Sequence, residues 1–225
     1  MRLSIKIIFV MGLFLWSFGI VAQTVNWKRL GTDNTHLLNA NAGLEYGLIY
    51  GVGYGYYIDA VRPIILSFEY SAPSGITLLD DLKTKAGMKI KLLEINSFVV
   101  SANMYGLYRR YENDFVRLGN VGSDISAIAG FYKSKWFVAA EFGFDKAIVT
   151  NFKHSDLYRS YFPQVNDGWY QPSTGGNIYC VAQAGLSFGN HDVYLKAGSV
   201  FSQSLKPSPS LPFIVNLGYN FRISN

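Results

Sequence analysis

The chain has 225 residues, a single cysteine, Cys180, and a formal net charge of +5 at pH 7. Only 16% of the residues are charged, while 16 tyrosines, 16 phenylalanines and 22 glycines give a mixture typical of all-β proteins. One cysteine excludes an intrachain disulfide framework and a cysteine-based zinc site. The basic residues are scattered and form no run, so the positive charge does not indicate nucleic-acid binding.

Residues 1–22 have the parts of a secretory signal peptide. Arg2 and Lys6 precede an apolar run from residue 7 to residue 18, and Ala22 stands before Gln23. The run is short for a membrane-spanning helix, so we expect cleavage near Ala22; a retained anchor is the alternative. Residues 23–225 then form one exported domain. No later apolar stretch reaches about 18 residues, so any further membrane crossing must use strands.

The segment 39–58 alternates between large apolar and small residues without a break. One face carries Leu44, Tyr46, Leu48, Tyr50, Val52, Tyr54, Tyr56 and Ile58, and the other carries Gly43, Glu45, Gly47, Gly51, Gly53 and Gly55. A period of two predicts a strand. Because a two-residue hairpin would exchange the two faces, the unbroken pattern favours one long strand. A row of glycines is typical of the crowded interior of a narrow barrel.

Eight further strands follow from the same alternation. They cover about residues 63–71, 85–93, 98–108, 125–131, 136–144, 177–188, 192–201 and 213–223. A poorly marked strand near Val25 and Trp27 makes the number even, as a barrel with both ends on one side of a membrane requires. The sequence therefore predicts an all-β protein, a closed antiparallel up-and-down transmembrane β-barrel of ten strands, with eight as the alternative.

The connections between these strands alternate in length. Those at 59–62, 94–97, 133–135 and 189–191 are short, and those at 72–84, 109–122, 146–176 and 202–212 are long. Outer-membrane barrels have short periplasmic turns and long external loops. The final strand ends at the chain terminus, so we expect every long loop to be external.

Three segments resemble the small outer-membrane β-barrel proteins of Gram-negative bacteria, which have a porin-like architecture. They are the signal peptide, the hairpin VGSDISAIAGFYKSKWFVAAEFGFDKA and the closing strand IVNLGYNFRISN. The resemblance implies an outer-membrane location in the cell envelope, contact with membrane lipid and lipopolysaccharide, and recognition of the closing strand by the barrel-assembly machinery through Tyr219 and Phe221. The chain continues four residues past Phe221, which departs from that pattern. No catalytic residue is carried over.

Charged residues of both signs fall on the inward-facing parity of these strands. They are Glu45, Glu69, Lys89, Lys91, Asp124, Glu141, Asp145, Lys196 and Arg222. A barrel of about this size has an interior that side chains can fill, and buried charges are costly unless they pair. We therefore expect a lumen filled by a polar and charged network. A narrow path for ions or small solutes is the alternative.

The longest predicted loop, residues 150–176, is rich in aromatic residues. Tyr158, Arg159, Trp169 and Tyr170 are candidates for recognition of a surface ligand, because aromatic and arginine side chains often anchor binding surfaces. Such a patch could bind a glycan, a partner protein or lipopolysaccharide. The favoured alternative is that the aromatics fold the loop over the barrel mouth as a lid.

An enzymatic function depends on three histidines, His36, His154 and His191. The run Lys153-His154-Ser155-Asp156 contains the residue types of a hydrolase, but neighbours in a loop do not supply the required geometry of base and nucleophile. No group of residues has metal-ligand spacing. The sequence thus favours a non-enzymatic outer-membrane protein without cofactors, with a structural or surface-interaction role. A narrow channel and a surface hydrolase are the alternatives.

Overall fold

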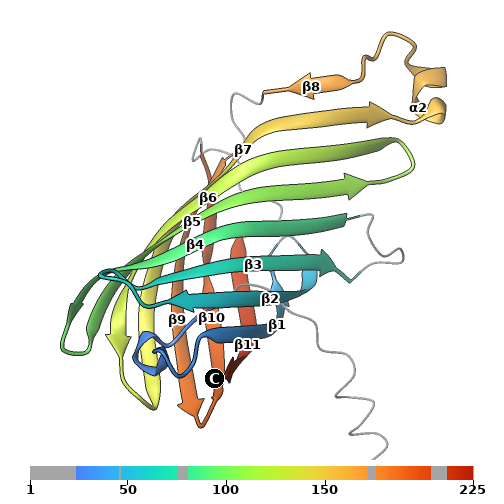
Figure 1. Ribbon diagram of the computed structural model, residues 1–225. Coiled ribbons are helices and arrows are strands. Elements are labelled where there is room, and N and C mark those ends of the chain that lie inside the picture. The colour runs from blue at the N-terminus through green and yellow to red at the C-terminus, as the bar shows by residue number, and fades with distance from the viewer. Residues whose placement is uncertain (1–23, 46, 75–80, 172–175, 204–211, 225) are drawn as a thin grey trace, which may run out of the picture.

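A computed structural model describes residues 24–45, 47–74, 81–171, 176–203 and 212–224. The predicted signal peptide, residues 1–22, lies outside them. Ten antiparallel strands form a closed ring, confirming the predicted barrel and its strand number (Figure 1). The ring strands are β1 His36–Leu44, β2 Leu48–Ile58, β3 Ile64–Pro73, β4 Asp81–Ile95, β5 Phe98–Glu112, β6 Val116–Tyr132, β7 Trp136–His154, β9 Gly176–Phe188, β10 His191–Ser202 and β11 Phe213–Ile223. In the described residues, no helix is long and apolar enough to cross a membrane.

The alternating segment 39–58 is not one strand, as predicted, but belongs to the hairpin of β1 and β2. Leu44 pairs with Leu48, so three residues connect the strands. Paired residues lie on the same face of the sheet, and residues i and i+4 are both odd or both even. The alternation of large and small residues therefore continues through this turn without a break. The predicted strand near Val25 and Trp27 is also wrong. This segment enters a short 3-10 helix, η1 Trp27–Arg29, and its apolar side chains are buried.

The predicted long loop at residues 109–122 is wrong as well. β5 continues to Glu112, β6 begins at Val116, and Glu112 pairs with Arg117. On the other side, β7 extends to His154, followed by α2 Asp156–Tyr161 and β8 Gly168–Tyr170. Within the described ranges, β8 pairs with β7 alone, and it stands outside the ring.

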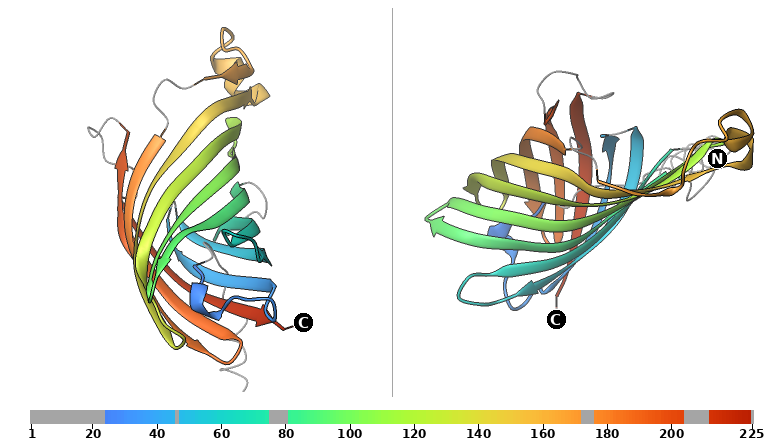
Figure 2. Two further views of the ribbon diagram at one scale, coloured as in Figure 1. Left: turned by 60° about the vertical axis from the view of Figure 1, so that its left-hand side comes forward. Right: turned by 90° about the horizontal axis from the view of Figure 1, so that it is seen from above.

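We call residues 108–121 and 149–171 the wing, because these parts of β5, β6 and β7, with α2 and β8, extend the wall of the barrel. A β-bulge in the pairing of β6 and β7, at Val121 and Gly122, marks its base. Figure 2 shows that the wing projects away from the ring and does not fold across the barrel mouth. The predicted lid is therefore wrong.

The polarity of the barrel wall is the reverse of that in a water-soluble protein: apolar side chains face outward and charged side chains face inward. Large apolar side chains are exposed on the outward face of every ring strand. Examples in ring order are Leu38, Val52, Phe68, Leu93, Met104, Ile125, Phe142, Leu186, Leu195 and Leu217. The buried charged side chains of the strands point inward, and they are Glu69, Lys83, Lys89, Asp124, Glu141, Asp145, Asp192 and Arg222. At the end of the barrel that holds the C-terminus, an apolar cluster fills the lumen. It includes Trp27, Leu37, Tyr132 and Phe137.

Candidate functional site

Among the residues that the structure describes, six carboxylates and six basic groups pair one to one in the lumen. Lys83 pairs with Glu45 at 2.5 Å, Lys85 with Asp124 at 2.6 Å, Lys196 with Glu141 at 2.6 Å and Lys89 with Glu69 at 3.7 Å, and Arg109 with Asp145 and Arg222 with Asp192 form two further pairs. Each buried charge therefore has a counter-charge, which offsets much of its desolvation cost.

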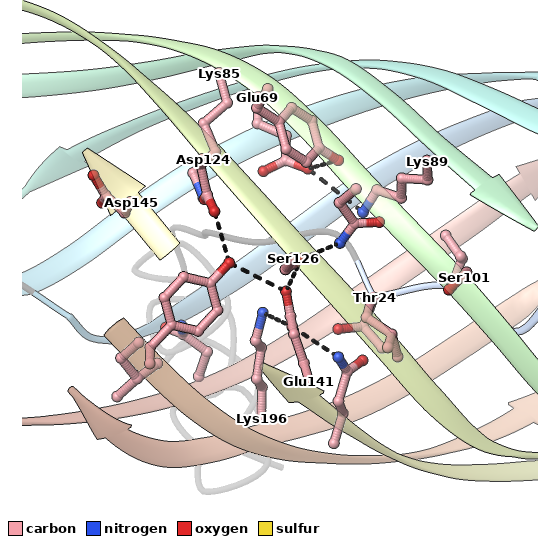
Figure 3. A pocket seen from close by; sticks show the side chains of 18 of the residues that line it. Thr24, Glu69, Lys85, Lys89, Ser101, Asp124, Ser126, Glu141, Asp145 and Lys196 are labelled. Carbon is pink, nitrogen blue, oxygen red and sulfur yellow. Dashed lines mark hydrogen bonds and ion pairs between the residues drawn. The ribbon is translucent and has the colours of Figure 1, made fainter. Parts of the chain in front are cut away.

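Glu141 on β7 makes the largest number of contacts in this network (Figure 3). Its Oε2 atom lies 2.6 Å from Lys196 Nζ and accepts a hydrogen bond of 2.8 Å from Gln183. Its Oε1 atom accepts hydrogen bonds from Ser126 at 2.8 Å and from the Tyr179 hydroxyl at 3.4 Å. Four donors from three other strands thus converge on one carboxylate, which is 3% exposed.

A second group of contacts links β9 with β4, β5 and β6. The Tyr179 hydroxyl donates to Asp124 Oδ1 at 2.7 Å, while Lys85 binds the other oxygen of that carboxylate. Lys85 and Lys89 lie 5.7 and 5.8 Å from the ring centroid of Tyr105, within the range of cation–π attraction. These contacts therefore link β4, β5, β6 and β9 along the inside of the barrel wall.

The N-terminal segment closes the end of the lumen that holds the short turns. Asn26 donates hydrogen bonds of 2.9 Å to the carbonyl of Lys133 and to the hydroxyl of Ser187. Trp27 is 4% exposed and packs in the apolar cluster. The β6–β7 turn and the neighbouring end of β9 thus hold this segment inside the barrel as a plug.

The remaining space in the lumen is small. A cavity of about 60 Å³ lies between the plug and the charged network, lined by Trp27, Tyr105, Glu141 and Lys196 among others. A water molecule needs roughly 10–15 Å³ of such volume. The cavity can therefore hold a few waters and is too small for a solute of substrate size.

The predicted network residues fall in two places. Glu45, Glu69, Lys89, Asp124, Glu141, Asp145, Lys196 and Arg222 all make lumen pairs. Lys91 does not: it pairs at 2.7 Å with Glu94, which also binds Lys28, and these side chains are partly exposed at the rim. β4 has a bulge after Lys91, where the inward row ends.

Four members of the network were missed by the sequence reasoning, namely Lys83, Lys85, Arg109 and Asp192. Lys83 and Lys85 share the parity of Lys89. Lys83 precedes the predicted strand 85–93, and Lys85 is its first residue. Arg109 lies just past the predicted end of its strand. Continuing the inward parity beyond the apolar stretch would have found these three, because β4 and β5 are longer than their apolar stretches. Asp192 is the first residue of the predicted strand 192–201 and shares the parity of Lys196.

Three of the four predicted recognition residues hold the wing together. The Tyr158 ring stacks on His154 with centroids 5.2 Å apart, and the Tyr170 ring meets Phe152 edge-on at 5.3 Å. Arg159 binds Asp167. Trp169 is 63% exposed and is the one with the most surface available.

The predicted hydrolase motif is used for local structure. The Ser155 hydroxyl caps α2 by accepting from the Tyr158 amide at 3.1 Å. Asp167 accepts from the His154 amide at 2.9 Å and lies 3.0 Å from Nδ1 of that ring. The His154 amide and ring, with the Arg159 guanidinium, hold the pKa of Asp167 below its usual value. No group of three His, Cys, Asp or Glu residues that could hold a metal occurs within the described ranges.

No protein-family model and no curated protein sequence matches this chain.

Proposed function

We propose that this protein is an integral outer-membrane barrel with a filled, non-conducting lumen, and that it serves a structural or surface-interaction role. The observation that carries the proposal is the inverted wall: buried charges point inward, and every ring strand exposes large apolar side chains outward. An apolar surface that surrounds a whole molecule is unfavourable in water. A closed barrel satisfies all its backbone groups between strands, and its apolar outside fits a lipid environment.

The height of the apolar belt supports the same proposal. On β7 the outward side chains from Trp136 to Ile148 are apolar except for Lys146, near the end of the row. The 12 intervals between these two residues span roughly 40 Å at about 3.3 Å per residue, or about 28 Å of height at a strand tilt of about 45°. A bilayer has an apolar core of about 30 Å. The belt thus matches the thickness that it would have to cover.

The lumen supports a structural role over a channel. Six ion pairs line its inner wall, and the plug around Trp27 closes one end. An aqueous channel belongs to wider barrels of about 16 strands. We further propose that the short-turn end faces the periplasm, with the C-terminal strand read by the barrel-assembly machinery, and that the wing faces outward.

Two measurements test this proposal. In a Cys180→Ser background, an environment-sensitive label on Phe142→Cys should report acyl chains after reconstitution into liposomes, while the same label on Ser126→Cys should not. In planar bilayers the protein should show no steady conductance. A mature protein that stays soluble without detergent would overturn the membrane location. A conductance that Glu141→Gln changes would instead support the narrow channel.

A further inference from the structure

The outward face of the wing differs in chemistry from the apolar belt beneath it. Arg117 pairs with Lys153 on β7, and Asn151 pairs with Trp169 on β8. Residues paired across antiparallel strands point to the same side. Val121, paired with Val149, continues this row down to the belt. The surface therefore changes from aliphatic to basic and aromatic along the strands.

Two hollows on this face meet at Arg117. One, of about 280 Å³, is lined by Tyr108, Arg110, Arg117, Asn151 and Trp169 with the backbone around Gly119. The other, of about 210 Å³, is lined by Arg117 and Lys153, by Glu112, Asn113 and Val116 around the β5–β6 turn, and by His154 and Ser155. A basic group thus stands between two concave surfaces, one of which carries aromatic walls.

The protein neutralises only part of the positive charge of this face. Arg110 binds Glu112. Arg117 and Lys153 are exposed, and neither forms an ion pair with another side chain in the part of the chain that the structure describes. This contrasts with the lumen, where every basic group has a carboxylate. The two free cations are therefore available to an external anion.

The height of these residues identifies the layer that they would meet. Asn151 is three positions past Ile148 and Lys153 is five positions past it. At about 3.3 Å per residue and a tilt of about 45°, they lie roughly 7 and 12 Å above the apolar belt. The phospholipid headgroup layer is roughly 5–8 Å deep on each side. A lipid headgroup that carries sugars extends further from the apolar core and reaches the heights of both Asn151 and Lys153.

We propose that this face of the wing binds the phosphorylated headgroup of a glycolipid in the leaflet that it faces. Arg117 and Lys153 bind phosphate through charge-assisted hydrogen bonds, and the exposed ring of Trp169 packs against a sugar. The inference rests on the proposed membrane location. It adds a ligand class and a site to that proposal.

The test compares two charge reversals in the full mature protein refolded in neutral detergent. One variant is Arg117→Glu with Lys153→Glu. The matched control is Arg62→Glu with Lys135→Glu, which makes the same charge change at exposed turns on the opposite end of the barrel. Native mass spectrometry measures binding of bis-phosphorylated lipid A and of the same lipid without phosphates.

The wild type and the control should bind the phosphorylated lipid alike, and the wing variant at least tenfold more weakly, since each basic residue contributes about 1 kcal/mol near an anionic surface. Equal binding by all three proteins would overturn the inference, as would equal binding of the dephosphorylated lipid. Insertion of all three proteins into liposomes is scored separately. Failure there would contradict the membrane location, whereas normal insertion with unchanged lipid binding would contradict only this site.

Discussion

The ammonium group of Lys196 on β10 lies 2.6 Å from the carboxylate of Glu141 on β7, although β9 separates the two strands. Both side chains are buried, with 11% and 4% of their surface exposed. The pair therefore ties together parts of the wall that are not neighbours in the sheet. Removing one member would leave a buried charge without its counter-charge.

Lys196→Met should lower the free energy of unfolding by about 3–5 kcal/mol, because Glu141 would lose its cation in a buried site. The measurement is urea unfolding from liposomes. Adding Glu141→Gln to the same chain should recover part of the loss. Lys91→Met, at the partly exposed rim pair, is the control and should cost under about 1 kcal/mol. Equal effects at the two sites would contradict the network.

The plug offers a second prediction. Trp27→Ala should destabilise the barrel by about 3–5 kcal/mol, because a large buried ring leaves a cavity that the closed wall cannot collapse to fill. Trp169→Ala should change stability by less than about 0.5 kcal/mol, since that ring is 63% exposed. Thermal or urea unfolding followed by circular dichroism compares the two. A Trp27 variant as stable as the Trp169 variant would mean that the plug contributes no packing energy.

The interior glycines make room for aromatic rings. A Cβ atom on Gly218 would overlap the ring of Tyr194, whose hydroxyl accepts hydrogen bonds of 3.0 Å from Asn39 and Asn41. Gly218→Ala should therefore cost about 1–3 kcal/mol in unfolding free energy, because the ring must move and both hydrogen bonds lengthen. Gly106→Ala is the matched control, since its nearest neighbour would be 3.8 Å away. Similar stabilities of the two variants would show that the ring has room to shift.

The wing should loosen in acid. His154 and Arg159 lower the pKa of Asp167 in the folded protein, so the carboxylate contributes stability above the ordinary aspartate pKa of about 3.9. This contribution is lost as the pH falls through the lowered pKa. Proteolysis of the α2 region by an acid protease should therefore accelerate below about pH 4.

The matching variant is Asp167→Asn, which should be cleaved readily at neutral pH and show a much weaker acid dependence. The barrel itself should remain intact in both proteins, as judged by circular dichroism. An unchanged acid profile in the variant would show that another group controls the wing.

The sequence predicted the ring well, because a strand with one lipid-like and one polar face has a period of two that needs no tertiary information. The prediction of a single strand over residues 39–58 was wrong, because the three-residue turn between Leu44 and Leu48 does not interrupt the alternation of large and small residues. Prediction from the sequence also failed at Val25 and Trp27, since an apolar plug inside a barrel has the composition of a strand. These errors cancelled in the strand count.

The charged residues of the lumen were mostly predictable, but their partners were not. Parity places Glu141 and Lys196 inward, yet which two groups meet across the lumen depends on the stagger of the strands around the ring, which no local pattern encodes. The wing was missed for a related reason. β5, β6 and β7 continue beyond their apolar stretch with polar residues on both faces, so alternation of hydrophobicity stops before the strands do.

The pairing of β1 with β11 has a consequence for biogenesis. His36 lies opposite Ile223 and Leu44 opposite Val215, so the first and last ring strands form the seam of the barrel over nine residue pairs. Until residues 213–223 are present, β1 and β10 are both edge strands. Each then exposes a row of backbone N–H and C=O groups without hydrogen-bond partners. A chain truncated before the last strand therefore cannot close the barrel, and we expect it to be degraded or to aggregate with other incomplete chains.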